Sequence, residues 1–253
     1  MKTHRAPMAL RPNPEGPLPP AAMVLAAGLG KRMRPLTATR PKPLVRVHGK
    51  TLLDHALDNL RASDVRRVVV NVHYLAGQVE AHLARNAADL DIAVSDERDA
   101  LLETGGGVAK ALPLIGADPF FVVNSDNMWV DGPIDTLRQM ARRWDPDIMD
   151  ALLLVVPLAR AHGYEGRGDF HMTGEGLLAR RRGARVAPFV FSGVQLLKAS
   201  LFDDVPEGAF SINLIYDRLI ESGRLYGIAH TGQWFHVGTP GAVKETEALL
   251  GNG

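Results

Sequence analysis

Near the start of the chain, a stretch rich in glycine and basic residues has the composition of a phosphate-binding loop. Gly28 and Gly30 are followed directly by Lys31 and Arg32. Glycine lets the backbone approach a phosphate chain and point N–H groups at it, while the cations neutralise its charge. A dinucleotide fingerprint needs glycine where Met33 stands, and a P-loop needs Gly-Lys-Ser or Gly-Lys-Thr from there. The stretch therefore predicts a triphosphate loop of another type, although the two glycines alone also suit an ordinary solvated turn.

The tripeptide Pro41-Lys42-Pro43 closes the same connection. The two prolines restrict their own backbone and that of the preceding residues, so Lys42 stands in a stiff, extended segment. A Pro-Lys-Pro sequence by itself indicates a rigid loop. Next to the glycine-rich stretch, it predicts a lysine held in place to contact a phosphate.

Asp126 follows the apolar run 120–124, which reads as a buried strand. In parallel sheets, ligands bind outside the carboxyl ends of the strands. Hard divalent cations prefer carboxylate oxygens and bind together with substrate phosphates. We therefore expect Asp126 to bind magnesium; the alternative is an aspartate that stabilises a turn or a helix end.

The first half of the chain alternates short β-rich runs with helical patterns, which is the signature of βαβ units on a parallel sheet. Residues 68–72 and 120–123 are apolar on both faces and are expected to be central strands. The expected strands are residues 22–26, 68–72, 92–95 and 119–124, and the expected helices are residues 51–62, 76–88 and 104–112.

After about residue 150, turns separate strand-like segments with little helix between them. The expected elements are strands near residues 152–156, 170–173, 176–179, 187–197 and 225–230, with helices at 212–222 and 241–250. No linker separates the halves. We expect residues 21–253 to form one domain with a cleft. Residues 1–20 contain six prolines and are expected to be a flexible arm.

The composition excludes several classes of protein. The 253 residues include no cysteine, so disulfides, thiol nucleophiles and thiolate metal sites are ruled out. A formal net charge of +1 argues against broad binding to nucleic acid or to acidic membranes. No apolar stretch is long enough to span a bilayer. These features lead us to expect a cytoplasmic protein with no nucleic-acid or membrane partner.

At Gly28, Gly30, Arg32, Pro41 and Lys42 the chain resembles the sugar-1-phosphate nucleotidyltransferases, whose pattern is Gly-x-Gly-x-Arg followed by Pro-Lys. Three further segments narrow this resemblance to the bacterial N-acetylmuramate 1-phosphate uridylyltransferases of peptidoglycan recycling. They are Glu103-Thr104-Gly105-Gly106-Gly107, Gly166-Arg167-Gly168-Asp169-Phe170 and Phe191-Ser192-Gly193. The similarity runs from about residue 23 to residue 250.

This resemblance implies a Rossmann-like α/β fold of the nucleotide-diphospho-sugar transferase type. Such a fold has a mixed, mostly parallel sheet with helices on both faces and a small sugar-binding lobe. By this resemblance the nucleotide-binding part covers about residues 21–130 and the sugar-binding part about residues 131–253. It also implies attack of a sugar 1-phosphate oxygen on the α-phosphorus of a nucleoside triphosphate, UTP here, with release of pyrophosphate. The implied cofactor is Mg²⁺, with Mn²⁺ as an alternative. Arg32, Lys42 and Asp126 would be the catalytic residues, Arg32 on the departing β,γ-phosphates and Lys42 on the α-phosphate or the sugar phosphate.

Two further groups of residues acquire roles by the same resemblance. The nucleotide-binding group is Leu25, Ala26, Ala27, Gly28, Gly30, Lys31, Arg32, Thr104, Gly105 and Gly106. The sugar-binding group is Asn124, Gly168, Asp169, Ser192 and Gly193. In this interpretation, residues 104–107 form a loop before a helix, with N–H groups free for the uracil and ribose. A plain helix start capped by Thr104 is the alternative.

The chain departs from the family pattern at two positions. Ser125 replaces a glycine before Asp126, and His236 replaces the aspartate that serves as the second metal ligand. Neutral imidazole suits manganese or zinc better than magnesium. His236 would therefore bind a softer metal, contact magnesium through water, or leave the ion to Asp126 and the phosphates. We favour magnesium, either contacted by His236 through water or held by Asp126 and the phosphates.

Two alternatives to the uridylyltransferase remain open from the sequence. One is a guanylyl- or other nucleotidyltransferase acting on mannose, heptose or glucose 1-phosphate. The other is a non-catalytic nucleotide-sugar sensor on the same fold, for which the His236 replacement is the motive. The oligomeric state is also left open.

Overall fold

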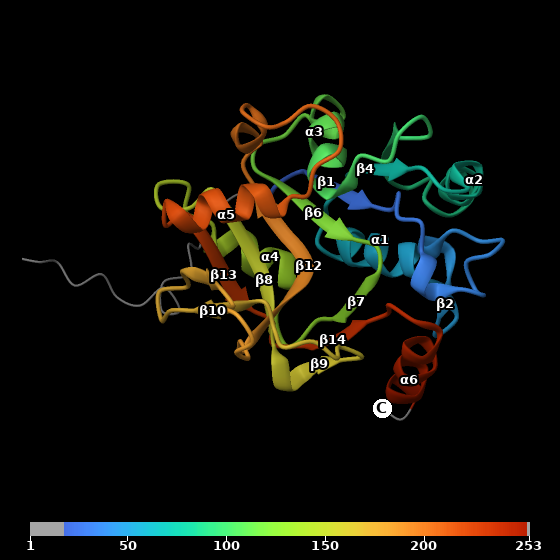
Figure 1. The fold of residues 1–253 in the computed structure, drawn as a ribbon. Coiled ribbons are helices and arrows are strands. Elements are labelled where there is room, and N and C mark those ends of the chain that lie inside the picture. Colours follow the sequence, from blue (N-terminus) through green and yellow to red (C-terminus); the bar gives the residue numbers. More distant parts are fainter. Residues whose placement is uncertain (1–17, 252–253) are drawn as a thin grey trace, which may run out of the picture.

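The computed structural model describes residues 18–251, and a central mixed sheet organises this part of the chain (Figure 1). β5, β4, β1 and β6 are parallel neighbours, and β12 then runs antiparallel to both β6 and β8. β13 is parallel to β8, the short β10 pairs with the first residue of β12, and β11 pairs with β10. The strands are β1 (Ala21–Leu25), β4 (Arg67–Val72), β5 (Asp91–Asp96), β6 (Phe120–Asn124), β8 (Ala151–Pro157), β10 (Phe170–Met172), β11 (Leu178–Arg180), β12 (Phe189–Leu197) and β13 (Leu225–Ala229).

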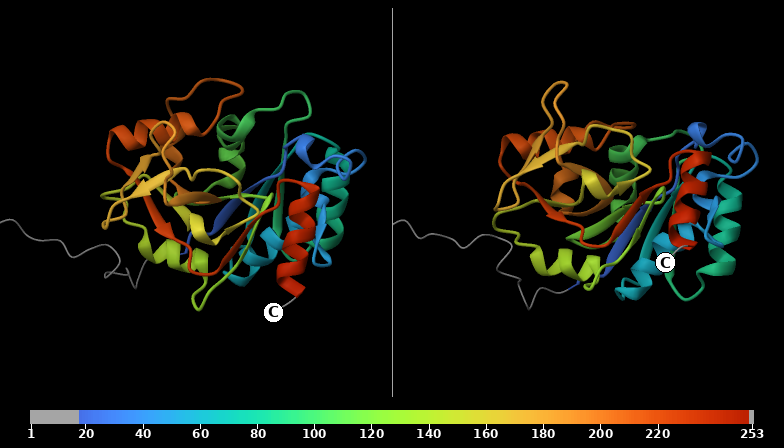
Figure 2. Two further views of the ribbon diagram at one scale, coloured as in Figure 1. Left: turned by 60° about the horizontal axis from the view of Figure 1, so that its bottom comes forward. Right: turned by 90° about the horizontal axis from the view of Figure 1, so that it is seen from below.

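Helices cover both faces of this sheet, as expected (Figure 2). Alternate residues of the strands point to opposite faces, so each face has its own apolar core. On β1, Ala22 and Val24 pack with α1, α2 and α4, whereas Met23 packs with α3 and α5. The helices are α1 (Leu52–Ala62), α2 (Ala76–Asn86), α3 (Glu103–Ile115), α4 (Thr136–Arg143), α5 (Asn213–Glu221) and α6 (Pro240–Gly251).

Two small sheets and four short 3-10 helices complete the described chain. A three-stranded sheet has the order β7–β14–β9, and β2 and β3 form a hairpin. The small strands are β7 (Asn127–Val130), β9 (Ala161–His162), β14 (Gln233–His236), β2 (Arg46–Val47) and β3 (Lys50–Thr51). The 3-10 helices are η2 (Lys31–Met33), η3 (Lys42–Leu44), η4 (Leu158–Arg160) and η5 (Ala199–Phe202).

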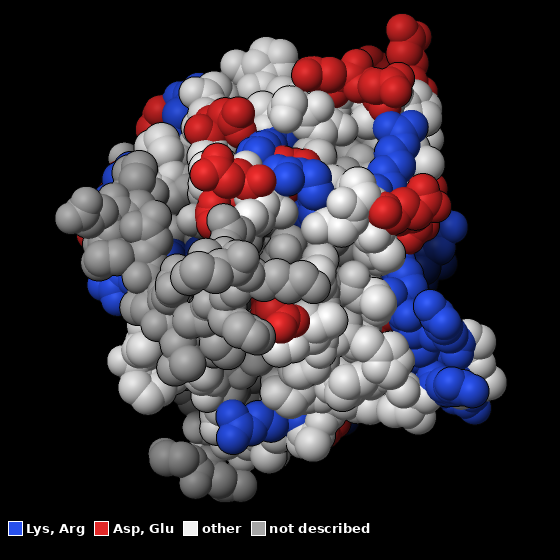
Figure 3. Space-filling view, turned by 90° about the vertical axis from the view of Figure 1, so that its left-hand side faces the viewer, with Lys and Arg blue, Asp and Glu red and all other residues white. Residues whose placement is uncertain are grey.

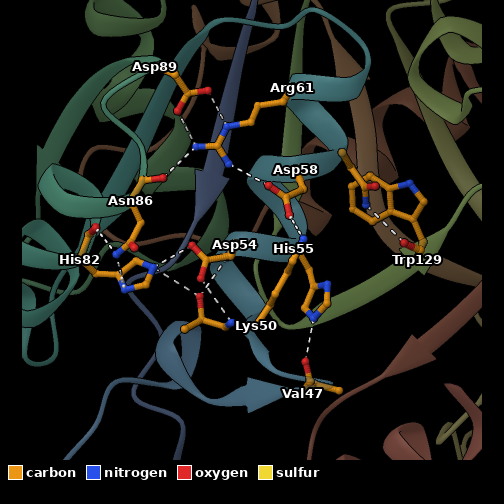
Figure 4. Close-up of polar contacts among 12 residues, drawn as sticks. Val47, Lys50, Asp54, His55, Asp58, Arg61, His82, Asn86, Asp89 and Trp129 are labelled. Atoms are coloured by element: carbon orange, nitrogen blue, oxygen red, sulfur yellow. Dashed lines mark hydrogen bonds and ion pairs between the residues drawn. The ribbon is translucent and has the colours of Figure 1, made fainter. Parts of the chain in front are cut away.

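Polar contacts fix α1 against α2 and the chain that follows it (Figure 4). Thr51 and Asp54 form a reciprocal capping box at the start of α1, and His82 of α2 contacts Asp54 at 2.7 Å. At the other end, Arg61 donates two hydrogen bonds of 2.8 Å to the carboxylate of Asp89. These contacts hold both ends of α1 against α2 and the segment after it.

Most expected elements are confirmed, and the differences that matter for the site are these. Helix α4 was not anticipated, nor was the small sheet of β7, β14 and β9. The glycines expected in a loop before a helix lie inside α3, which begins at Glu103. That helix continues to Ile115 through Pro113, beyond the expected end at residue 112. A helix as short as α4 and strands of two to four residues span too few positions for a periodic pattern to identify them in the sequence.

The remaining large-scale predictions concern the arm, membranes and surface charge. The expected Pro-rich arm falls almost wholly on residues 1–17, outside the described residues. Within residues 18–251, no helix has both the length and the hydropathy needed to cross a bilayer. On the face shown in Figure 3, small groups of basic and acidic side chains lie among larger areas of other residues.

Candidate active site

The glycine-rich loop leaves the sheet at the carboxyl end of β1. Gly30 has φ of 62°, a left-handed conformation that glycine adopts without strain. A Cβ at this position would come within 3.0 Å of both the Lys42 Cβ and the Thr37 Cγ2. Thr37 donates a 2.8 Å hydrogen bond to the Gly30 carbonyl. Gly30 is thus required both by its backbone angle and by its packing against Lys42.

Lys42 and Asp126 meet at the ends of two neighbouring parallel strands. Lys42 begins the 3-10 helix η3 after Pro41, and its side chain is largely buried. Its Nζ lies 2.8 Å from Oδ2 of Asp126, in the turn after β6. Burial alone would raise the pKa of Asp126, but the charge and hydrogen bond of Lys42 hold that pKa below its usual value. Asp126 is therefore an anion at neutral pH.

His236 stands beside Asp126 because of strand pairing. β14 runs antiparallel to β7, and His236 is the direct partner of Asn127. The His236 Nδ1 lies 3.0 Å from Oδ1 of Asn127, and because a carbonyl oxygen only accepts, Nδ1 donates. Burial lowers the pKa of His236, the Asp126 charge opposes this, and the Lys42 and Arg32 charges lower it further. The neutral ring keeps its lone pair on Nε2.

Two cavities open at this end of the sheet. The first, of about 370 Å³, includes Lys42 and Asp126 in its wall, and the second, of about 780 Å³, includes Arg32 and His236. The first is lined by Leu25, Ala26, Ala27, Gly28, Lys42, Pro43, Asn71, Leu101, Glu103, Thr104, Asn124, Ser125, Asp126 and Ser211. Arg32 is solvent-exposed on η2, and its charge acts on both Asp126 and His236. Both cavities thus border the cluster of charged groups formed by Lys42, Asp126, Arg32 and His236.

The structure places part of the expected nucleotide-binding group in the wall of the first cavity. The residues of the group that line it are Leu25, Ala26, Ala27, Gly28 and Thr104. Lys31 is exposed, and Gly30 packs against Lys42 and Thr37.

The expectation for Gly105 and Gly106 is wrong in one respect, because their N–H groups are not free for a ligand. Both are buried in α3 and donate to the carbonyl of Phe210, at 2.9 and 3.2 Å. A Cβ at Gly105 would lie 2.3 Å from the Phe210 ring, and a Cβ at Gly106 would lie 2.1 Å from the Gly208 carbonyl. Because these glycines have no side chain, the segment 208–212 packs directly against the start of α3. Ser211 of this segment forms part of the cavity wall.

The expected sugar-binding group is only partly assembled at these cavities. Asn124 lines the first one. Gly193, with φ of 88°, packs against Asn124 and Asn127. Asp169 accepts a 2.9 Å hydrogen bond from the Phe191 N–H.

Gly168 and Ser192 serve packing. Gly168 has φ of 74°, and a Cβ there would lie 2.1 Å from the Ala187 carbonyl. Ser192 has no exposed surface, and its hydroxyl accepts from the Val194 N–H at 3.1 Å. A direct contact between the Ser192 side chain and a sugar is therefore not available in this structure.

Sequence reasoning missed several residues of the first cavity, among them Asn71, Leu101, Glu103 and Ser211. Asn71 carried a visible signal, since it is the single polar residue in the buried run 68–72. An amide in the middle of a covered strand needs hydrogen-bond partners, and such partners often belong to a site. Leu101 and Ser211 lie in loops and carried no such signal.

The α/β architecture is that of the nucleotide-diphospho-sugar transferase fold. HddC from Yersinia pseudotuberculosis, complexed with GMP-PN, superposes with a TM-score of 0.73 and 22% identity, covering 91% of this chain and 99% of that one. A UDP-glucose pyrophosphorylase complexed with UDP-glucose gives a TM-score of 0.71 at 16% identity, covering 92% and 99%.

Sequence comparison identifies the family. Residues 21–166 match the family model of the nucleotidyl transferases. The N-acetylmuramate alpha-1-phosphate uridylyltransferase of Caulobacter vibrioides is 46% identical over 235 residues, covering 92% of this chain and 97% of that protein. The protein of the same name from Neisseria meningitidis serogroup B is 36% identical, covering 91% and 98%. The chain belongs to the nucleotidyl transferase family, as one of its sugar-1-phosphate nucleotidyltransferases.

Proposed function

We propose that this chain joins UTP to N-acetylmuramate 1-phosphate, giving the UDP-sugar and pyrophosphate, in peptidoglycan recycling. The observation that carries the proposal is the Lys42–Asp126 pair, which lies between the glycine loop of β1 and the end of β6. Two relatives of 46% and 36% identity bear the name of this activity and match this chain over nearly their whole length. We place the nucleotide mainly on residues 21–130 and the sugar on residues 131–253 of one unit, in the cytoplasm.

In the proposed reaction, an oxygen of the sugar 1-phosphate attacks the α-phosphorus of UTP. The bond from the α-phosphorus to the bridging oxygen breaks, and the electron pair leaves with pyrophosphate. The nucleophile is already an anion, so the protein must mainly bring two anions together and stabilise the charge on the phosphate oxygens. Lys42 supplies a point charge at the α-phosphate or the sugar phosphate. The forked guanidinium of Arg32 suits the departing β,γ-phosphates.

The donor set fits a magnesium ion that is shared with substrate phosphates. Within residues 18–251, no three histidine or acidic side chains gather to hold a metal by themselves. Asp126 offers a carboxylate held ionised by its surroundings, and Mg²⁺ is commonly bound by one or two carboxylates plus phosphates and water. When bound, the ion would neutralise triphosphate charge and polarise the α-phosphate. His236, with its lone pair on Nε2, would contact the ion through water or bind Mn²⁺ directly.

A pyrophosphate-release panel tests the proposal. It crosses UTP, CTP, GTP and ATP with N-acetylmuramate, mannose and glucose 1-phosphates, in Mg²⁺ and in Mn²⁺. We expect the highest kcat/KM with UTP and N-acetylmuramate 1-phosphate. Higher kcat/KM with GTP and mannose 1-phosphate would show that these, and not the proposed pair, are the substrates. Binding of nucleotide without turnover under either metal would show a nucleotide-sugar sensor instead.

A further inference from the structure

Glu97 is a carboxylate enclosed in the protein behind the first cavity. It directly follows β5, and only 1% of its surface is exposed. Its Oε1 accepts a 2.7 Å hydrogen bond from the Asn71 Nδ2, and its Oε2 accepts a 3.1 Å bond from the Leu102 N–H. Among residues 18–251 no basic side chain forms an ion pair with it. Both side-chain oxygens of Glu97 are thus engaged by neutral donors inside the protein.

Asn71 connects Glu97 to the glycine-rich loop. It lies on β4, also almost fully buried, with its side chain at the wall of the first cavity. Its Oδ1 accepts a 2.6 Å hydrogen bond from the Ala26 N–H, just after the end of β1. Since Nδ2 of the same amide donates to Glu97, the orientation of Asn71 is fixed at both ends.

The two ends of this chain of hydrogen bonds reach two separate segments that contribute to the cavity wall. Ala26 belongs to the loop 25–28, which forms one part, and Leu102 lies between Leu101 and Glu103, which form the other. Helix α3 rests directly on the pair, because a Cβ at Gly107 would lie 2.8 Å from Oε1 of Glu97 and 3.1 Å from Nδ2 of Asn71. The close contact with Glu97 and Asn71 therefore leaves no room for a side chain at Gly107.

We propose that Glu97, acting through Asn71, is a positioning residue that sets the spacing between the two parts of the nucleotide cavity. Its effect falls on binding of the nucleoside triphosphate rather than on binding of the sugar 1-phosphate. The inference rests on the proposed function, in which this cavity receives UTP.

The first test is Glu97→Gln, which keeps the shape of the side chain. Glutamine has one acceptor oxygen, so either the Asn71 amide or the Leu102 N–H then faces another donor. Loss of one charge-assisted bond leads us to expect a KM for UTP raised about 10-fold. The KM for the sugar 1-phosphate should stay within about twofold, and kcat within about threefold. Glu80→Gln is the matched control: Glu80 lies on α2 and bonds the exposed Arg98, and its loss should change neither KM.

The second test is a reversal of the pair. Asn71→Asp sets two carboxylates against each other and should raise the KM for UTP further. Adding Glu97→Gln restores every bond, because the new amide donates to residue 71 while its oxygen accepts from Leu102 N–H. Both variants carry a carboxylate at position 71, so their comparison isolates the hydrogen bonds. We expect the double variant to have a KM for UTP at least about fivefold below that of Asn71→Asp alone.

Calorimetric dissociation constants for UTP and thermal melting temperatures accompany each kinetic measurement. Equal rises in both KM values with a lowered melting temperature, or no recovery in the double variant, would show that the pair only supports the fold. An unchanged KM and dissociation constant for UTP in Glu97→Gln would also overturn the inference. Wild-type protein that binds UTP but releases no pyrophosphate would defeat the proposed function instead, while the dissociation constants would still decide the role of Glu97.

Discussion

The Nζ of Lys42 lies 2.8 Å from Oδ2 of Asp126, although 84 residues separate the two along the chain. The pairing follows from the sheet, since β1 and β6 are parallel neighbours with Leu25 opposite Asn124. The loops that leave these two strands must therefore start side by side. A cation and a carboxylate at that point can hold two phosphate groups and a metal ion together, which is what nucleotidyl transfer requires.

Removal of the Lys42 cation should mainly affect turnover. For Lys42→Ala we expect kcat/KM for pyrophosphate release to fall on the order of 10²-fold or more, because charge stabilisation at the phosphate is lost. Lys50→Ala is the control, since that lysine is exposed and pairs with Asp58 at the surface. A Lys42→Ala enzyme within about threefold of wild type would refute the assignment of this residue.

Loss of the Arg32 guanidinium should also lower turnover, for a different reason. Arg32→Ala removes the forked contact to the departing phosphates, and we expect kcat to fall on the order of 10²-fold. Arg32→Lys keeps the charge but not the fork, so it should recover only part of the activity. Steady-state pyrophosphate release measures both variants, and full activity in Arg32→Ala would remove this residue from the site.

The residue at position 236 should set the metal preference. A carboxylate is a better ligand for Mg²⁺ than a neutral imidazole, so His236→Asp should lower the Mg²⁺ concentration needed for half-maximal activity. It should also lower the ratio of Mn²⁺- to Mg²⁺-supported kcat/KM, by about fivefold or more on the same preference. Manganese binding followed by electron paramagnetic resonance gives an independent measurement. Identical metal profiles in the two proteins would show that His236 does not approach the ion.

Helix α3 should not tolerate a side chain at Gly106. In Gly106→Ala the new Cβ would meet the Gly208 carbonyl at 2.1 Å and displace the segment that carries Ser211. We expect the free energy of unfolding to fall by about 2 kcal/mol, within the usual range for overpacking. Gly77→Ala on α2 meets nothing within 4 Å and should not destabilise the protein. Equal denaturation midpoints for the two variants would contradict this account of the glycine run.

Stability should fall in mild acid because of His230. Burial lowers the pKa of this histidine, which is 3% exposed and contacts Thr136 and the Gln233 carbonyl. Since its folded-state pKa lies below the unfolded value of about 6.5, the unfolded chain binds the proton more readily. The free energy of unfolding is then unaffected above that pH and decreases as the pH falls through the interval between the two pKa values. His230→Gln should flatten this part of the stability profile, and a slope that persists in the variant would assign it to other groups.

Much of the fold could be predicted because it depends on patterns within short segments of the sequence. The alternation of apolar strands and amphipathic helices fixes βαβ units, and glycines and prolines mark the loops at the strand ends. The proximity of Lys42 and Asp126 was expected on this basis, because loops that leave the carboxyl ends of neighbouring parallel strands start close together. Helix α4 and the sheet of β7, β14 and β9 were missed, since their segments are too short for a periodic pattern.

The sequence by itself determined the βαβ core, the loop with Gly28 and Gly30, and the cations that follow it, because these depend on local conformation and residue chemistry. Only the tertiary structure decided which groups are free to bind a ligand. It assigned the N–H groups of Gly105 and Gly106 to Phe210, paired His236 with Asn127, and joined Asn71 to Glu97. Hydrogen-bond partners far apart in the chain are chosen by how the elements pack, and no single segment contains that information.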